Sequence, residues 1–220
     1  MEHAAAQSHY MKKSIKYILS VIAIAVIGYN SLYFKKLDAV KHASSVKQFD
    51  AVAYAANLYH QRLVPGLDKA ADIIILSAAL ENDPAKAFAM YSHAPGIGNI
   101  RYFLVKGTGN VTAIGENDIT LALAPDSLKK EVKITTEFVY GNAIRDASGL
   151  VDLNEFSNTA DFNNVSAEIN RIVRKEVLPA FKASIQKGDS IRFYAAMELN
   201  QAHLKPGLPE LVPVALTIVQ

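Results

Sequence analysis

One stretch near the middle of the chain, residues 131–170, constrains the fold more than any other. It begins with an alternation of apolar and polar side chains, which is typical of a half-buried β-strand. The apolar face of this strand would carry Val132, Ile134, Thr136, Phe138 and Tyr140. A polar turn with Arg145 and Asp146 follows, and an amphipathic helix begins after Asn158, a favourable capping residue. Strand, turn and helix in this order predict a mixed α+β domain.

Further strands are expected on both sides of this stretch. Residues 102–106 and 111–114 flank Gly107-Thr108-Gly109-Asn110, so they form either one long strand bent at the glycines or a hairpin. Alternating segments also occupy residues 119–123, 191–199 and 212–219. Three strands, a helix and two strands are the elements of the OB barrel in their order. We therefore predict an OB-like five-stranded β-barrel over residues 99–220, with a helix between strands 3 and 4.

Residues 38–98 show helical periodicity instead. Apolar side chains recur every three or four positions from Phe49 to Leu63, and Pro65-Gly66 is expected to end this first helix. A second helix is expected to begin at Leu67, and a third at Asp83-Pro84, with Asp83 as its cap. We predict a helical layer that precedes the barrel.

An uncharged, apolar run over residues 17–34 follows the basic sequence MKKSIKY. This layout is typical of a secretory signal, and its length is close to the minimum of ~17–25 residues for a spanning helix. Bulky residues follow the apolar run and disfavour cleavage, so we predict an uncleaved transmembrane signal anchor over residues 11–37, in contact with the inner membrane through residues 17–34. Residues 1–10 are interpreted as an extension before a natural start at Met11. Cleavage to a soluble periplasmic protein, or a reversed anchor with a cytoplasmic domain, are the alternatives.

Composition and the absence of known motifs exclude several classes of function. The chain has no cysteine, so it has no disulfide, thiol nucleophile or thiolate metal site. Its formal net charge of +2 does not indicate a nucleic-acid partner. The glycine-rich segments match neither a dinucleotide fingerprint nor a phosphate-binding loop, and no serine stands in a nucleophile elbow. We predict no cofactor, no metal and no catalytic residue.

The run over residues 141–170 resembles a bacterial family of predicted periplasmic lipoproteins that share a domain of unknown function. The shared positions are Gly141, Ala143, Ile144, Arg145, Asp146, Ala147, Glu155, Phe156, Asn158, Phe162 and Asn170. The similarity extends from Phe49-Asp50 to residues 212–214. Thr159 replaces a glutamine of the family pattern, and Tyr29 stands where a lipidated cysteine would follow Val26-Ile27-Gly28. The resemblance implies a periplasmic domain, often encoded beside sugar ABC transporters.

Arg145 and Asp146 are the first candidates for ligand- or partner-binding residues, because a guanidinium fork suits carboxylates, phosphates and sugar hydroxyl pairs. Adjacent residues on an extended chain point to opposite faces, so the two are not expected to pair with each other. The structural alternative is that Arg145 ties the turn to the barrel and Asp146 accepts backbone hydrogen bonds. Asn158, Asn170 and Phe156 complete the candidate set. The asparagines could bind sugar hydroxyls or could serve only as caps and solvated side chains.

Together these observations predict a membrane-anchored periplasmic module that binds without catalysing a reaction. Its partner would be a small carbohydrate or a sugar ABC transporter component. One alternative is a structural envelope protein that docks another protein through an exposed apolar patch. Another is an enzyme such as a hydrolase, which would bring at least two of four residues into one cleft. These residues are Asp146, Asp152, Glu155 and His203.

Overall fold

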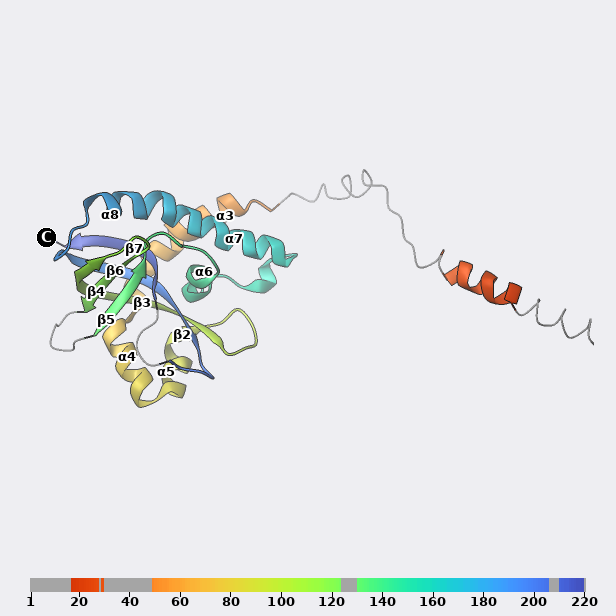
Figure 1. Ribbon diagram of the computed structural model, residues 1–220, viewed down its shortest axis with the longest axis horizontal. Helices are drawn as coiled ribbons and strands as arrows, with labels where there is room; N and C mark the ends of the chain where they lie inside the picture. Colours follow the sequence, from red (N-terminus) through yellow and green to blue (C-terminus); the bar gives the residue numbers. More distant parts are fainter. Residues whose placement is uncertain (1–16, 28, 30–48, 124–129, 206–209, 220) are drawn as a thin grey trace, which may run out of the picture. The chain divides into compact units, whose positions relative to one another are not determined.

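The structure is a computed structural model that describes residues 17–27, 29, 49–123, 130–205 and 210–219. The chain divides into two compact units, Met1–Gln48 and Phe49–Gln220. In the first unit, residues 17–27 form a helix, drawn in orange-red in Figure 1. The predicted extension over residues 1–10 and most of the predicted anchor beyond residue 27 lie outside the described residues. Within the described part of the chain, no helix has both the length and the apolar character that crossing a membrane requires.

A closed β-sheet forms the centre of the second unit (Figure 1). Its main strands are β3 (Ile100–Ile114), β4 (Asp118–Leu123), β5 (Glu131–Thr135), β6 (Ser190–Asn200) and β7 (Val212–Val219). They hydrogen-bond in the order β5-β4-β3-β6-β7, with every neighbouring pair antiparallel. The two short strands β1 (Ala71–Asp72) and β2 (Ser92–His93) add to β3 outside this path.

A parallel bridge joins the two outer strands of this order. The N–H of Thr135 donates to the carbonyl of Leu211 at 3.0 Å, and the N–H of Leu211 donates to the carbonyl of Lys133 at 2.8 Å. The sheet therefore closes on itself. The predicted α+β class and the predicted order of elements, with helices between the third and fourth main strands, are confirmed.

Strand β3 has partners along both of its edges. Residues 100–110 pair with β6, and residues 109–114 pair with β4 with a register shift near Val111. Of the two possibilities for residues 107–110, the structure has the single bent strand. A Cβ at Gly109 would lie 2.6 Å from the carbonyl oxygen of Ala122 in β4. Only glycine allows this approach of the two backbones, because real Cβ atoms essentially never come so close.

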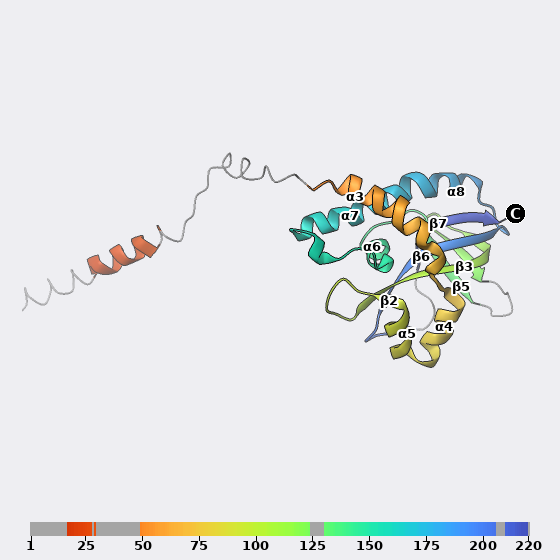
Figure 2. The ribbon, with the colours of Figure 1, turned by 180° about the vertical axis from the view of Figure 1, so that it is seen from behind.

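The interior of the closed sheet is one apolar cluster. Inward-facing residues of the strands, among them Phe103, Leu121, Ile134 and Phe193, are fully buried there. Helices α4 (Ile73–Asn82) and α5 (Pro84–Tyr91) lie beside one end of the strands in both views and contribute Leu76 and Phe88 to this cluster (Figure 1, Figure 2). Helix α8 (Leu178–Ser184) contributes Phe181.

A second apolar cluster lies on the outer side of β3, β6 and β7, between the sheet and a layer of helices. The layer consists of α3 (Ala51–Asn57), the π-helical η1 (Leu58–Leu63), the 3-10 helix η2 (Val64–Lys69), α6 (Ala143–Ser148), α7 (Thr159–Ile172) and the π-helical η5 (Val173–Val177). Tyr59 links this layer to the sheet by a hydrogen bond, which its hydroxyl donates to the carbonyl of Val214 at 2.7 Å. Burial raises the pKa of Tyr59 to about 12, so this hydroxyl stays a donor.

The predicted strand before Arg145 is too long. It ends at Thr135, and the side chains of Phe138 and Tyr140, which were expected on its buried face, are 61% and 62% exposed. The strand ends there because its neighbour β4 begins at Asp118, directly opposite Thr135. Beyond that point the chain has no edge of β4 with which to pair, and it turns away from the sheet.

The helices predicted within residues 38–98 differ from those of the structure at two joints. Pro65-Gly66 does not end the first helix, because Pro65 lies in the first turn of η2, where its missing N–H does no harm. Helix α4 begins at Ile73 instead of Leu67, since the Asp72 side chain accepts hydrogen bonds from two N–H groups of its first turn. The prediction that Asp83 caps the third helix is confirmed by the hydrogen bond it accepts from the first turn of α5 at 3.1 Å.

Gly109→Ala is expected to lower the free energy of unfolding by about 1–3 kcal/mol, because the new Cβ would overpack against the backbone of β4. Gly96→Ala is the matched control, since a Cβ there would meet nothing within 4 Å, and we expect it to change stability by less than about 0.5 kcal/mol. Urea unfolding of the full chain in mild detergent, followed by circular dichroism, measures both. Equal stabilities of the two variants would contradict the proposed role of this close approach.

Candidate functional site

The segment around Arg145 is a short helix, α6, and the prediction of a polar turn is wrong for these residues. The N–H of Asp146 donates to the carbonyl of Asn142 at 2.9 Å, which closes the first helical turn. Gly149 ends the helix with a left-handed φ of 62°. Arg145 and Asp146 are only 2% and 6% exposed, because α6 packs on the outer face of β3 and β6.

Arg145 and Asp146 pair with each other, contrary to the prediction. The Nε atom of Arg145 donates to Oδ1 of Asp146 at 2.6 Å, and Nη2 donates to Oδ2 at 3.1 Å. Successive side chains of a helix are about 100° apart, so neighbours can converge in a way that an extended chain does not allow. Burial raises the pKa of the Asp146 carboxyl, and the hydrogen bonds and charge of Arg145 offset part of this increase.

The Arg145 guanidinium also joins α6 to α7. Its Nη1 atom donates to the carbonyl of Phe162 at 2.9 Å, and its Cζ atom lies 3.4 Å from the centroid of the Phe162 ring. Phe162 in turn contacts Phe156, which packs against Tyr54 and Phe49, with ring centroids 5.3 to 5.5 Å apart. Arg145, Asp146 and Phe156 are thus brought into one buried assembly of charged and aromatic side chains.

The two candidate asparagines lie toward opposite ends of α7. Oδ1 of Asn158 accepts a hydrogen bond from the N–H of Asp161 at 2.9 Å, so Asn158 caps the helix as predicted. Asn170 is 3% exposed, and its Nδ2 atom donates to the carbonyl of Gly141 at 2.8 Å. Both side chains hold the backbone of the helical layer, and the structure does not bring them to a common site. A binding role for the five candidates stays a prediction.

Two of the carboxylates named for the hydrolase alternative share an open hollow. Asp152 and Glu155 line it together with Ala94, Pro95 and residues 149–151 and 153. Oδ1 of Asp152 accepts a hydrogen bond from the N–H of Asn154 at 2.8 Å, at the start of η4 (Leu153–Glu155). Oε2 of Glu155 accepts one from the hydroxyl of Tyr54 at 2.9 Å. Asp146 is buried elsewhere against Arg145, and His203 is not among the residues that line this hollow.

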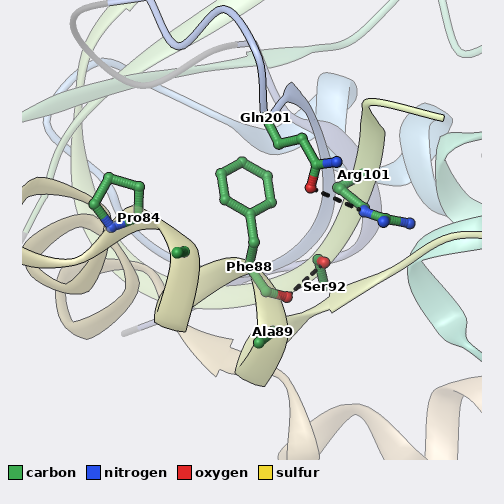
Figure 3. Close-up of a pocket in the computed structure, with 7 residues that line it drawn as sticks. Pro84, Phe88, Ala89, Ser92, Arg101 and Gln201 are labelled. Carbon is green, nitrogen blue, oxygen red and sulfur yellow. Dashed lines mark hydrogen bonds between the residues drawn. The ribbon is translucent and has the colours of Figure 1, made fainter.

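The larger candidate site is an open cleft of about 590 Å³ beside α5, here called the α5 cleft. Its lining residues are Pro84, Ala85, Phe88, Ala89, Ser92, Arg101 and Gln201. In Figure 3 the ring of Phe88 lies between Pro84 on one side and Gln201 on the other, with Arg101 beside Gln201. The cleft therefore has an apolar wall from α5 and a polar wall from the first residues of β3 and the turn after β6.

Hydrogen bonds fix the polar wall of the α5 cleft. The Nε atom of Arg101 donates to Oε1 of Gln201 at 3.3 Å (Figure 3), and Nε2 of Gln201 donates to Oδ1 of Asn99 at 3.4 Å. The Ser92 hydroxyl donates to the carbonyl of Phe88 at 2.7 Å. Within the described residues, the two terminal nitrogens of Arg101 have no hydrogen-bond partner, so they are available to a ligand. Our sequence analysis missed this site because no local pattern connects residues 101 and 201.

Comparison with solved structures places the fold in a known class. The chain is similar to an OB-fold protein from Thermotoga maritima, with a TM-score of 0.68 and 26% sequence identity over 79% of this chain and 100% of that chain. The similarity defines the protein as an α+β protein with an OB-like barrel. The family model described as "Predicted periplasmic lipoprotein (DUF2291)" matches residues 22–217, and the chain belongs to this family. The resemblance inferred from the sequence is therefore confirmed. A search of curated proteins found no match.

Arg145→Met is expected to lower the free energy of unfolding by about 3–5 kcal/mol, because it leaves the Asp146 carboxylate buried without its partner. The double variant Arg145→Met, Asp146→Leu removes both charges and is expected to recover most of this loss. Urea unfolding of the full chain measures both variants. If the single variant is as stable as the wild type, the pair does not hold α6 to α7.

Proposed function

We propose that the protein is a membrane-anchored periplasmic module that binds a small carbohydrate in the α5 cleft and serves carbohydrate uptake without catalysis. The family description supports a periplasmic, membrane-attached protein. We propose the predicted uncleaved helix over residues 17–34 as the attachment, since Tyr29 stands in place of a lipidated cysteine. The sugar-transport context comes from the family resemblance alone, and the α5 cleft supplies the physical argument.

The arrangement of Arg101, Gln201 and Phe88 is the observation that carries this proposal. Guanidinium and amide groups are planar and present several hydrogen-bonding groups side by side, which suits neighbouring hydroxyls of a sugar. Pro84, Ala85 and Ala89 are exposed and offer an apolar wall for the C–H face of a sugar ring, with the buried ring of Phe88 behind them. The volume of about 590 Å³ falls within the range of small-molecule sites, roughly 300–1,000 Å³.

The lining of the cleft also favours binding over catalysis. None of its described lining residues is an aspartate, a glutamate or a histidine, the residue types that most often act as general acid or base. Its one hydroxyl side chain, Ser92, donates its proton to the carbonyl of Phe88 at 2.7 Å and has no neighbouring base in the lining. Such a site can hold a ligand, but it lacks the paired groups that hydrolysis requires.

We expect Arg101→Met to weaken carbohydrate binding at least about tenfold, because it removes hydrogen bonds from a charged donor. Isothermal titration calorimetry of the full chain in mild detergent, against a panel of neutral mono- and disaccharides, measures the dissociation constant. Arg192→Met is the matched control, since Arg192 is exposed on β6, outside the lining of the cleft. If no saccharide binds, or if the two variants weaken binding equally, the proposal fails.

A specific surface feature favours the second candidate function, a structural envelope protein that docks another protein. Phe138 and Tyr140 are both more than half exposed, on the segment between β5 and α6. Arg174 holds this segment, since its Nη1 atom donates to the carbonyl of Val139 and its Cζ atom lies 4.7 Å from the Tyr140 ring centroid. Exposed aromatic rings, one of them held by an arginine, are typical anchors of protein interfaces.

The docking function makes a different prediction from carbohydrate binding. Phe138→Ser is expected to abolish cross-linking of the protein to an envelope partner while leaving saccharide binding unchanged. Cross-linking in intact cells followed by mass spectrometry, with wild type and Arg101→Met as controls, separates the two functions. Cross-links that persist in Phe138→Ser would argue against this surface.

A further inference from the structure

A second hollow, distinct from the α5 cleft, lies where the first helices of the layer meet β2 and the end of α6. Its volume is about 290 Å³. It is lined by Arg62, Leu63, Gly66, Lys69, Ala71, Met90, Tyr91, His93, Leu104, Ala147, Ser148 and Leu150. We call it the cationic hollow, because its ionisable lining side chains, apart from Tyr91, are basic and none of its described lining residues is an aspartate or a glutamate.

Three different elements bring these basic side chains together. Arg62 comes from η1, Lys69 from η2 and His93 from β2. Nη2 of Arg62 donates to the carbonyl of Leu150 at 3.0 Å, which orients the guanidinium, and the Arg62 side chain also lies beside the hydroxyl of Tyr54. A guanidinium carries five N–H donors, so it can serve these neighbours and a ligand together. Within the part of the chain that the structure describes, neither Arg62 nor Lys69 forms an ion pair with a carboxylate.

The carboxylates near the cationic hollow are occupied elsewhere. Asp68, the neighbour of Lys69, accepts a hydrogen bond from the hydroxyl of Tyr194 at 3.3 Å. Glu155 accepts one from Tyr54, as described above. Glu155 and Arg62 share Tyr54 as a neighbour without a direct ion pair between them. An incoming anion could therefore form the direct ion pair that Arg62 and Lys69 lack among the described residues.

The wall of the hollow at residues 148–150 is tightly packed and hydrogen-bonded. A Cβ at Gly149 would lie 2.6 Å from Nδ1 of His93, so the imidazole packs directly on the glycine backbone. Gly149 also has a left-handed φ of 62°, which disfavours other residues at this position. The Ser148 hydroxyl donates to the carbonyl of Arg145 at 2.5 Å and accepts from the N–H of Leu150 at 3.1 Å. These contacts fix the wall that faces Arg62.

The floor of the hollow is apolar. Leu63 and Ala147 are 1% and 0% exposed, and Leu104 of β3 lies beside them in the lining. An apolar floor suits the carbon body of a ligand, and it lowers the local dielectric constant, which strengthens the attraction between a bound anion and the basic groups at the rim. The exposed side chain of Met90 and the half-buried Leu104 are the apolar surface that the carbon body of a ligand would cover.

We propose that the cationic hollow binds a small organic anion, with a carboxylate or phosphate group against Arg62 and Lys69 and a compact apolar or ring body over Leu104 and Met90. This site is separate from the carbohydrate site proposed above. It takes a different class of ligand, and no residue lines both sites. The protein would then bind two kinds of small molecule at two sites that are both lined by residues of α5.

Titration of the full chain in mild detergent with phenyl phosphate and with benzoate tests this proposal, with benzyl alcohol as the neutral counterpart of the same size. We expect at least one of the two anions to bind, benzyl alcohol to bind at least about tenfold more weakly, and binding to weaken as sodium chloride is raised. Comparison of phenyl phosphate with benzoate shows whether phosphate or carboxylate is the preferred group. Two-dimensional NMR spectra report binding at low affinity.

Lys69→Gln is expected to weaken anion binding at least about fivefold, because it removes one exposed but unpaired charge from the site. Lys187→Gln is the matched control: Lys187 is also exposed, and it precedes Gly188, whose N–H donates to the carbonyl of Val111 far along β3 from Leu104. Arg101→Met is expected to leave anion binding unchanged, which separates this site from the α5 cleft. The proposal is overturned if neither anion binds at 10 mM, if benzyl alcohol binds as well as they do, or if the two lysine variants behave alike.

Discussion

The approach of β3 to β4 at Gly109 is the constraint on which the rest of the structure depends. Residues 109 and 110 have partners on both sides at once, in β4 along one edge and in β6 along the other. A strand shared in this way can bend from one partner to the next only where a side chain does not intervene. The bend lets the sheet curl until Leu211 reaches β5, and this closure creates the interior in which Phe103 and Phe193 are buried.

The closed sheet still exposes an apolar outer face, and a buried ion pair organises the layer that covers it. Arg145 contacts Asp146 in its own helix and Phe162 in α7, so a single guanidinium sets the position of both helices. Burying charges is costly unless they are paired, and such pairs tend to select one packing arrangement rather than to add stability. Arg145, Asp146 and Phe162, three of the residues that carry the family resemblance, build this brace.

Both proposed binding sites lie where helices meet strands at the edge of the barrel. In the α5 cleft, Arg101 and Gln201 come from positions 100 residues apart and are joined by the antiparallel pairing of β3 with β6. In the cationic hollow, Arg62 is joined to Leu150 across 88 residues. In the α5 cleft the barrel supplies the polar groups and a helix supplies the apolar wall, whereas in the cationic hollow Arg62 and Lys69 come from the helical layer and Leu104 from the barrel.

The sequence by itself determined the features that depend on neighbours within a few residues. The caps at Asp83 and Asn158 and the order of strands and helices follow from local spacing, because hydrogen bonds and side-chain periodicity act over three or four positions. Only the tertiary structure decided where β5 ends, since that depends on where β4 begins. It also decided that Arg145 and Asp146 pair in a helix and that Arg101 meets Gln201. The first depends on α6 forming where an extended chain was expected, and the second on strand pairing across 100 residues, which no local pattern in a single sequence records.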